Sequence, residues 1–139
     1  MAGNSDLSDI LKHLNPELAQ EKFYFAQVSE SQLFGLVNHL SYIRCICREE
    51  EGLSILFSED IKEEMGEFGD EPVEGPFALI TLKVNSSLNA VGMIAKVSEA
   101  LAKEGIAVNV ISACSHDYLL VPYEKRENAL AALKRLEGA

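Results

Sequence analysis

A run of small polar residues stands directly before an apolar helical pattern in the second half of the sequence. Residues 85–92 (NSSLNAVG) contain two serines, two asparagines and a glycine. The N–H groups at a helix N-terminus carry partial positive charge and suit a carboxylate. Ser86, Ser87 and Asn89 add neutral donors, so the pattern predicts a carboxylate-binding loop. Ser and Asn also cap helices, and on that interpretation Ser87 or Asn89 serves the helix alone.

Cys114, His116 and Asp117 stand within four residues and suggest a nucleophile or a metal ligand set. A nucleophile needs a base within hydrogen-bond reach and an oxyanion site, which usually come from distant segments. No Cys-x-x-Cys or His-x-x-x-His spacing completes a zinc site. Turn formation accounts for Ser115 and Asp117. We therefore expect no catalysis here, and for His116 at most a contact at the edge of a ligand.

Two other groups of residues invite a metal interpretation. Cys45 and Cys47 share one face of a predicted strand, but two thiolates alone rarely hold a metal, and cysteine is among the most buried residue types. Residues 59–74 carry eight acids and one lysine, without the alternating Asp/Asn ligands of a calcium loop. The sequence therefore predicts no metal and no cofactor.

The charge of the chain is unevenly spread. Up to Pro76 there are 16 acidic and 5 basic residues, and from Phe77 onward 6 and 7, within a net charge of −10. A nucleic-acid binder needs a basic stripe, and an acidic surface repels DNA, RNA and anionic membranes. The sequence has no long apolar run, no secretory signal pattern and only three cysteines. We expect a cytoplasmic protein without nucleic-acid or membrane partners.

Hydrophobic periodicity predicts the elements of the second half. Apolar residues alternate along 77–84, as in a strand with one buried face, and recur at helical spacing along 88–104. Strands at 107–113 and 118–123 follow about a short turn, and a helix covers 125–137. The predicted order is β-α-β-β-α.

The first half repeats this order in a shortened form. Strands are predicted near 23–28, 43–48 and 53–58, with a weak helix at 31–41. An offset of 65 residues aligns the later strands of the two halves, and an offset of 54 aligns the first strands. The difference of 11 residues is close to three helical turns, so the first unit has lost most of its first helix.

The repeat predicts two domains. A helix is predicted at 5–14, and the acidic stretch becomes rich in Gly and Pro after Gly66, which is typical of a linker. We therefore expect a truncated unit with a leading helix over 1–70 and a second unit over 76–139.

The second unit resembles the ACT domain, a regulatory amino-acid-binding module with a ferredoxin-like fold. The resemblance lies in GMIAKV at 92–97, which opens a helix, and EGIAV at 104–108, which turns into a strand. It covers 76–137 and is weaker over the first unit. The chain is also similar to short stand-alone proteins with tandem ACT-like units and to the regulatory tails of aspartate kinases. The implied fold class is α/β (α+β), with two ferredoxin-like βαββα units and antiparallel sheets.

The resemblance also implies a ligand site. It places an amino acid between loop 86–93 and strand 108–112, with the backbone N–H groups of Gly92 and Met93 on its carboxylate. Asn109 and the backbone around Ile111 take the amino group, and His116 borders the side chain. Asn109 has a simpler interpretation, in which it lies on an open sheet face.

The family loop often reads Asp-Arg-Pro-Gly, whereas Asn89, Ala90 and Val91 occupy the first three positions here. Gly92 is kept and permits close backbone approach. The acidic and basic groups of the family pattern are therefore missing from this loop.

These observations predict a non-catalytic regulatory module that binds an amino acid or a similar small metabolite. Each unit is expected to lack the last ferredoxin-like strand, and open edges pair with a partner, so we expect a homodimer with an unidentified protein partner for output. One alternative is a structural or protein-interaction module that has lost ligand binding, which the missing acidic and basic groups favour. Another is a small enzyme that uses Cys114 and His116.

Overall fold

The computed structural model describes residues 3–68 and 72–139 and divides the chain into two compact units. The inserted unit is Glu21–Phe77. The terminal unit combines the residues up to Gln20 with Ala78–Ala139, so the chain leaves this unit and later returns to it. Strand β5 (Glu74–Leu82) contributes to both units, because the boundary falls within it. No helix in the described part of the chain is long and apolar enough to cross a membrane.

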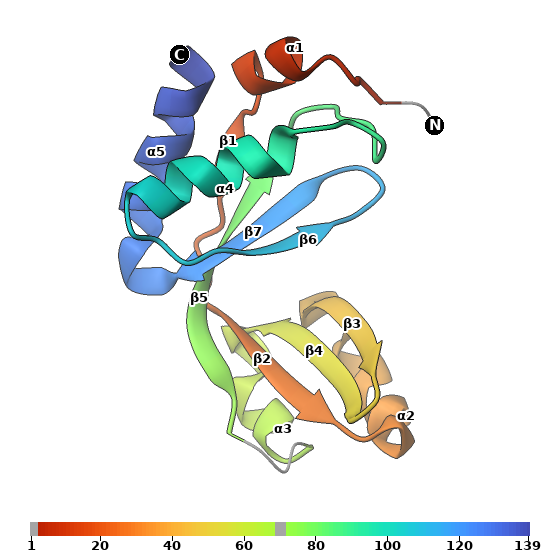
Figure 1. Cartoon of the computed structure of the whole chain (residues 1–139). Helices are drawn as coiled ribbons and strands as arrows, with labels where there is room; N and C mark the ends of the chain where they lie inside the picture. The colour runs from red at the N-terminus through yellow and green to blue at the C-terminus, as the bar shows by residue number, and fades with distance from the viewer. Residues whose placement is uncertain (1–2, 69–71) are drawn as a thin grey trace. The chain divides into compact units, whose positions relative to one another are not determined.

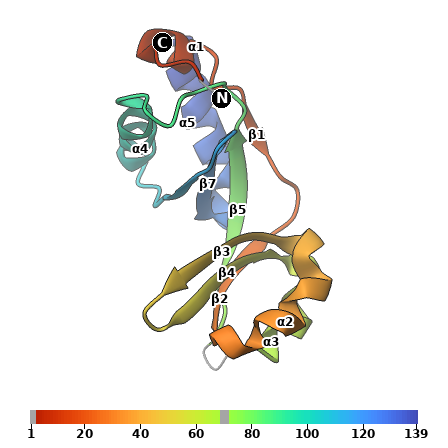
Figure 2. The same cartoon turned by 90° about the vertical axis from the view of Figure 1, so that its right-hand side faces the viewer.

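The inserted unit is an antiparallel sheet with short helices on one face (Figure 2). Its strands β2 (Phe23–Val28), β3 (Ile43–Glu49) and β4 (Gly52–Ser58) confirm the three predicted strands. They adjoin the start of β5 in the order β3-β4-β2-β5. Helix α2 (Leu33–Leu36) has 3₁₀ turns on both sides, at Glu30–Gln32 and Val37–Tyr42, and confirms the shortened first helix. Helix α3 (Lys62–Gly66) follows a 3₁₀ turn at Glu59–Ile61.

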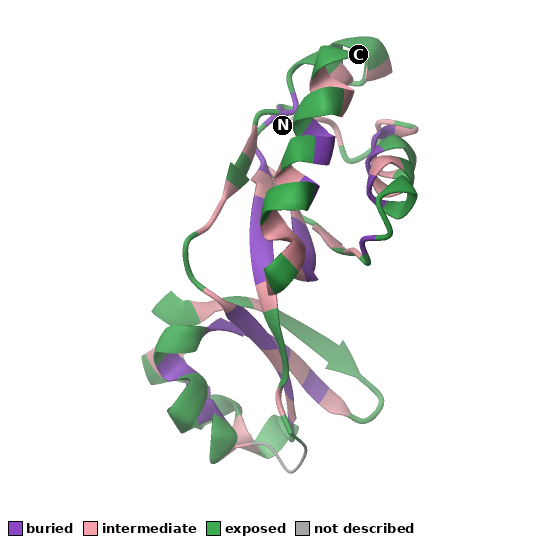
Figure 3. Ribbon diagram, turned by 90° about the vertical axis from the view of Figure 1, so that its left-hand side faces the viewer, coloured by how far each residue is buried: buried purple, intermediate pink, exposed green. Residues whose placement is uncertain are grey.

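Every second side chain of β2 packs against the helices of the inserted unit. Tyr24, Ala26 and Val28 point toward the helices and join Leu36 and Met65 in one apolar cluster. Successive side chains of a strand point to opposite faces, so these three residues share the face that the helices cover. In each unit the buried residues gather on the strands and on the helix sides that pack against them (Figure 3).

The terminal unit carries the longer helices. After β5 come α4 (Met93–Lys103), β6 (Asn109–Ser112), β7 (Asp117–Pro122), a 3₁₀ turn at Tyr123–Lys125 and α5 (Arg126–Gly138). The N-terminal residues add α1 (Leu7–Lys12) and β1 (Pro16–Leu18). The strand order is β1-β5-β7-β6 (Figure 1). The predicted ferredoxin-like class with antiparallel sheets is therefore confirmed.

The expectation that each unit lacks its last strand is wrong. In the inserted unit the start of β5 pairs with β2, at Phe23 with Phe77 and Phe25 with Glu74. In the terminal unit β1 pairs antiparallel with β5, from Pro16 with Leu82 to Leu18 with Ile80. The paired backbone satisfies groups that an open edge would leave exposed. In the described part of the chain each unit therefore has four paired strands, and β5 is counted in both because it is shared.

The leading helix packs in the terminal unit, whereas the expected division placed it in a unit over 1–70. Ile10 and Leu14 are fully buried in the same core as Leu82, Val97 and Leu133. Two fully buried aliphatic side chains are a strong anchor, because burying each contributes about 1.5–3 kcal/mol. The structural division therefore differs from 1–70 and 76–139 in the placement of residues 1–20.

Candidate functional site

The polar loop before α4 leaves the N-terminus of this helix without a side-chain cap. α4 begins later than the predicted residue 88, and its N-cap is Gly92, whose φ of 103° lies in the left-handed region. Neither Ser87 nor Asn89 caps the helix, so that interpretation is wrong. The Ser87 hydroxyl accepts the N–H of Asn89 at 3.0 Å, and the Ser87 carbonyl accepts the N–H of Ala90 at 3.0 Å. These bonds form a turn inside the loop.

The first N–H groups of α4 therefore remain available. The N–H of Lys96 bonds to the Gly92 carbonyl at 3.0 Å. The three N–H groups before it, at Met93, Ile94 and Ala95, have no partner within the helix, as in every α-helix. α4 has 11 residues, which is enough for an aligned backbone dipole.

A small pocket lies at this helix N-terminus. We call it the loop pocket; its volume is about 140 Å³. Its lining comes from the loop, the first turn of α4 and the β6–β7 turn, and consists of Ser86, Ser87, Leu88, Ala90, Gly92, Met93, Ile94, Ala95, Ser112, Ala113 and Asp117. The structure therefore brings together four of the predicted site residues: Ser86, Ser87, Gly92 and Met93.

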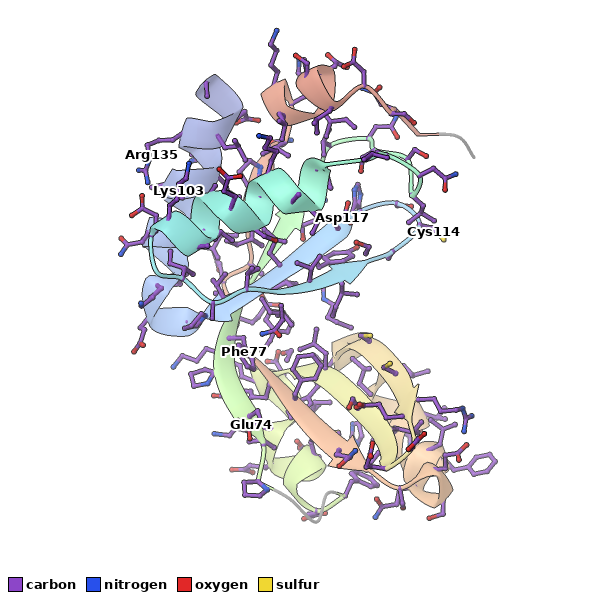
Figure 4. The ribbon with its side chains drawn as sticks, viewed as in Figure 1. Glu74, Phe77, Lys103, Cys114, Asp117 and Arg135 are labelled. Atoms are coloured by element: carbon purple, nitrogen blue, oxygen red, sulfur yellow. The ribbon has the colours of Figure 1, made fainter. Side chains whose placement is uncertain are left out.

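Asp117 places a buried carboxylate in the loop pocket. Its exposed fraction is 8%, and it stands at the start of β7 (Figure 4). The Ser112 hydroxyl donates to Oδ1, and the Ser86 hydroxyl donates to Oδ2 at 3.4 Å. Within the described part of the chain, no Lys, Arg or His forms an ion pair with this carboxylate. A buried carboxylate with hydroxyl partners alone is costly unless a cation joins it.

The sequence analysis missed Asp117 as a site residue because turn formation explained it. One signal was present: Asp is disfavoured in strands, and here it opens the apolar run DYLLVP.

A larger polar pocket adjoins the same loop. We call it the turn pocket; its volume is about 570 Å³. It shares Ser86, Ser87 and Leu88 with the loop pocket, and the remaining lining residues are Gly3, Lys83, Asn85, Asn89, Cys114, Ser115 and His116. The predicted residues Asn89 and His116 therefore lie around the turn pocket rather than the loop pocket.

His116 and Cys114 are not arranged as a catalytic pair. The His116 ring meets Tyr118 edge-to-face with centroids 6.5 Å apart. Its Nδ1 atom is buried and has no hydrogen-bond partner among the described residues. Cys114 is exposed in the turn between β6 and β7 (Figure 4).

Asn109 and Ile111 lie on β6 outside both pockets. Asn109 is exposed and pairs across the ladder with Leu120, whereas Ile111 is half-buried opposite Tyr118. Asn109 stands three residues from Ser112, which is about 10 Å along a strand. The structure therefore does not bring Asn109 to the pocket residues of its own chain.

Among its described residues, the inserted unit has no long helix at which an equivalent of the loop pocket could form. The counterpart of α4 is α2, whose four residues make a single turn. A pocket of about 350 Å³ lies against Phe25, Gln27, Glu49, Ser54 and Glu74, without a long helix beginning at it. The ligand chemistry predicted for a helix N-terminus therefore belongs to the terminal unit.

The two strand cysteines lie on the sheet of the inserted unit. Cys45 is half-buried and Cys47 is exposed. Burial raises the pKa of the Cys45 thiol, and the neighbouring Cys47 raises it further. Among the described residues, no three His, Cys, Asp or Glu side chains gather in a way that would hold a metal ion.

Models of the ACT domain match residues 74–135 and residues 2–66. The chain belongs to the ACT-domain family and contains two ACT units. Modules of this family are regulatory and bind small ligands, which defines the class of this protein. No curated protein matches the sequence.

Solved structures support the same assignment. A Vibrio cholerae protein of unknown function, described as a possible transport protein, is 32% identical; the alignment covers 92% of this chain and 93% of that chain, with a TM-score of 0.76. The regulatory subunit of aspartate kinase from Thermus thermophilus is 13% identical over 87% of this chain and 95% of that chain, with a TM-score of 0.68. A protein from Agrobacterium tumefaciens is 20% identical over 88% and 87%, with a TM-score of 0.67. The last two likenesses concern the fold.

Proposed function

We propose that the terminal unit binds a free α-amino acid in the loop pocket, and that the protein is a cytoplasmic, non-catalytic regulatory module. The observation that carries the proposal is the pairing of unlike charges in one pocket. The N-terminus of α4 supplies partial positive charge, and the Asp117 carboxylate supplies negative charge. An α-amino acid carries the complementary charges one carbon apart.

The carboxylate of the amino acid would accept the N–H groups of Met93, Ile94 and Ala95. Hydrogen bonds to a charged acceptor are about twice as strong as neutral ones, and these donors already point out of the helix. The loop contributes no fixed cation, so the backbone alone would hold the negative group.

The amino group would bind Asp117, which takes the role first expected of Asn109. An ammonium group has three donors, and the Asp117 oxygens keep acceptor capacity beyond the Ser112 and Ser86 hydroxyls. Such a partner would offset the cost of burying the carboxylate. This pairing favours an amino acid over a hydroxy acid or a keto acid.

The size of the loop pocket favours a short side chain. A longer one would cross residues 86–88 toward the turn pocket, where Lys83 and His116 lie. His116 keeps the role of an edge contact in this arrangement.

The test is a thermal-shift screen of the twenty amino acids, followed by calorimetry with the best one and its 2-hydroxy acid analogue. At about 100 times its dissociation constant, a ligand stabilises the folded state by about 2.7 kcal/mol. We expect the hydroxy acid to bind at least about tenfold more weakly, because it lacks the ammonium group. Asp117→Asn should weaken amino-acid binding and remove most of this discrimination. A screen without any shift, or equal binding by Asp117→Asn, would overturn the proposal.

We also propose a homodimer. β6 stands at the end of the strand order in the terminal unit, and Asn109 and Ser112 on it are exposed. Pairing two copies along such an edge would satisfy its backbone groups. A second copy is also the route by which Asn109 would approach a ligand.

A second candidate function, a protein-interaction module without a ligand, is favoured by one observation. Phe34 is 89% exposed in the inserted unit, and Leu33, Val37 and Leu40 near it are also exposed. Clustered exposed apolar side chains mark contact surfaces. This alternative predicts a flat thermal-shift screen, whereas the first predicts a response.

A further inference from the structure

Residues 3–7 lie against both ends of the polar loop at 86–92. The Asn4 carbonyl accepts the Ser87 N–H at 2.7 Å. Gly3 packs on the loop backbone so closely that a Cβ atom there would stand 2.6 Å from the Ser86 carbonyl carbon. At the other end, a Cβ atom on Gly92 would stand 3.0 Å from Leu7 Cδ2. The loop that forms both pockets therefore rests on this segment.

The same segment is anchored to the core of the terminal unit. The Asn4 side chain donates to Asp9 at 2.6 Å and accepts the Asp6 N–H at 3.0 Å. Asp6 in turn caps α1, accepting the Ser8 N–H at 3.1 Å. Buried Ile10 holds α1 against the core, and the bonds of Asn4 and Asp6 connect the segment to α1.

We propose that residues 3–7 are a clamp that positions the amino-acid-binding loop, with Gly3 and Leu7 as its positioning residues. The effect of the clamp on ligand affinity rests on the proposed function. The positioning of the loop by residues 3–7 does not depend on that function. A loop already held in its binding geometry spares the ligand the entropy of ordering it. By linkage, an amino acid that binds the ordered loop stabilises the docked clamp by the same coupling free energy.

The chain offers matched controls for both positioning residues. Leu7 and Leu11 are both half-buried on α1 and pack on the same core, but Leu7 is the one that stands against Gly92. Gly138 in α5 has nothing within 4 Å of its Cβ position, unlike Gly3. Leu7→Ala and Gly3→Ala are therefore compared with Leu11→Ala and Gly138→Ala.

The first measurement is amide hydrogen exchange of the whole chain without any ligand. We expect exchange at Ser87 and Ala90 to rise about tenfold in Gly3→Ala and Leu7→Ala, and to stay near the wild-type rate in the two controls. Unchanged exchange at both amides, or an equal rise in the controls, overturns the clamp whether or not an amino acid binds.

The second measurement is calorimetry with the amino acid that shifts the wild-type melt most. We expect affinity to fall about fivefold or more in Gly3→Ala and Leu7→Ala, and less than about twofold in the controls. Exchange that rises at the loop while affinity stays unchanged overturns the positioning role. A wild-type chain that binds none of the twenty amino acids, yet shows the exchange difference, overturns the proposed function and leaves the clamp standing.

Discussion

The Ser86 hydroxyl donates to Asp117 Oδ2 across 3.4 Å and so joins the loop before α4 to the first residue of β7. Ser112 donates to the other oxygen of the same carboxylate from the end of β6. One buried side chain therefore connects three segments that are separate in the sequence. These segments line the loop pocket together with the first turn of α4.

Ser112→Ala should lower the free energy of unfolding by about 1–3 kcal/mol. It removes a hydroxyl donor from a buried carboxylate, and a buried acceptor without its partner keeps its full desolvation cost. Urea denaturation measures the change. Ser41→Ala, at an exposed position in the inserted unit, should change stability by less than about 0.5 kcal/mol. Equal stabilities of the two variants would contradict this account of Asp117.

Gly92→Ala should destabilise the protein by about 1–2 kcal/mol. The φ of 103° is unfavourable for any residue with a Cβ atom, and the added atom would press on Leu7 Cδ2 at 3.0 Å. Thermal denaturation compares it with Gly138→Ala, where the helical backbone and the open surroundings should make the change nearly neutral. A neutral Gly92→Ala would show that α4 begins in another conformation.

Cys45 should react with iodoacetamide more slowly than Cys47 near pH 8. The thiolate is the reactive form, and burial together with Cys47 raises the pKa of the Cys45 thiol, which lowers its thiolate fraction at any given pH. Peptide mass spectrometry of a Cys114→Ser variant, which keeps both Cys45 and Cys47, gives the two rates. The Cys45 rate should rise toward higher pH, and it should rise slightly in Cys47→Ser, where one of the two causes is gone. Equal rates for both thiols would argue against a half-buried Cys45.

Leu14→Ala should cost about 2–5 kcal/mol, the usual range for a buried leucine. Because Leu14 lies in the core of the terminal unit, the loss of stability should appear in that unit. Hydrogen exchange should accelerate at Val97 and Leu133 in the terminal unit more than at Ile55 in the inserted unit. Faster exchange in the inserted unit than in the terminal unit would indicate that the N-terminal segment packs in the inserted unit instead.

Light scattering should give twice the chain mass of 15.3 kDa at micromolar concentrations. The expectation rests on the exposed edge strand β6 and on the tendency of such edges to pair. A mass near 15.3 kDa over the same concentration range would show a monomer, in which Asn109 lies outside both pockets.

The sequence predicted the strands of the inserted unit well because residue-type preferences for strands are a local signal. Aromatic and β-branched residues at 23–28 favour a strand without any distant contact, whereas the choice of Tyr24, Ala26 and Val28 for the face under the helices is a result of packing. β1 was not predicted, because three residues beginning with Pro16 carry no periodic signal, and only pairing with β5 makes them a strand.

Part of the site was predicted because its residues are close together in the sequence. The loop and the helix behind it are adjacent in the sequence, and the structure places Ser86, Ser87, Gly92 and Met93 at one pocket. Asp117 joins them only because the β6–β7 turn folds back toward the loop. Sequence proximity gave Asp117 a turn role, whereas its burial and its bond to Ser86 are tertiary facts.

The chain leaves the terminal unit at Gln20 and returns to it at Ala78. This connectivity affects folding during synthesis and the choice of boundaries when the gene is divided. A ribosome makes the inserted unit whole before α4 exists, while α1 and β1 must wait for the last residues of the chain to find their core. A gene cut at the sequence repeat, near residue 74, would separate α1 and β1 from the rest of the terminal unit. The N-terminal piece would carry α1 without its core, and the C-terminal piece would lack β1, the strand that pairs with β5. Recombination between relatives should therefore exchange the inserted unit at Gln20 and Ala78, rather than swap halves.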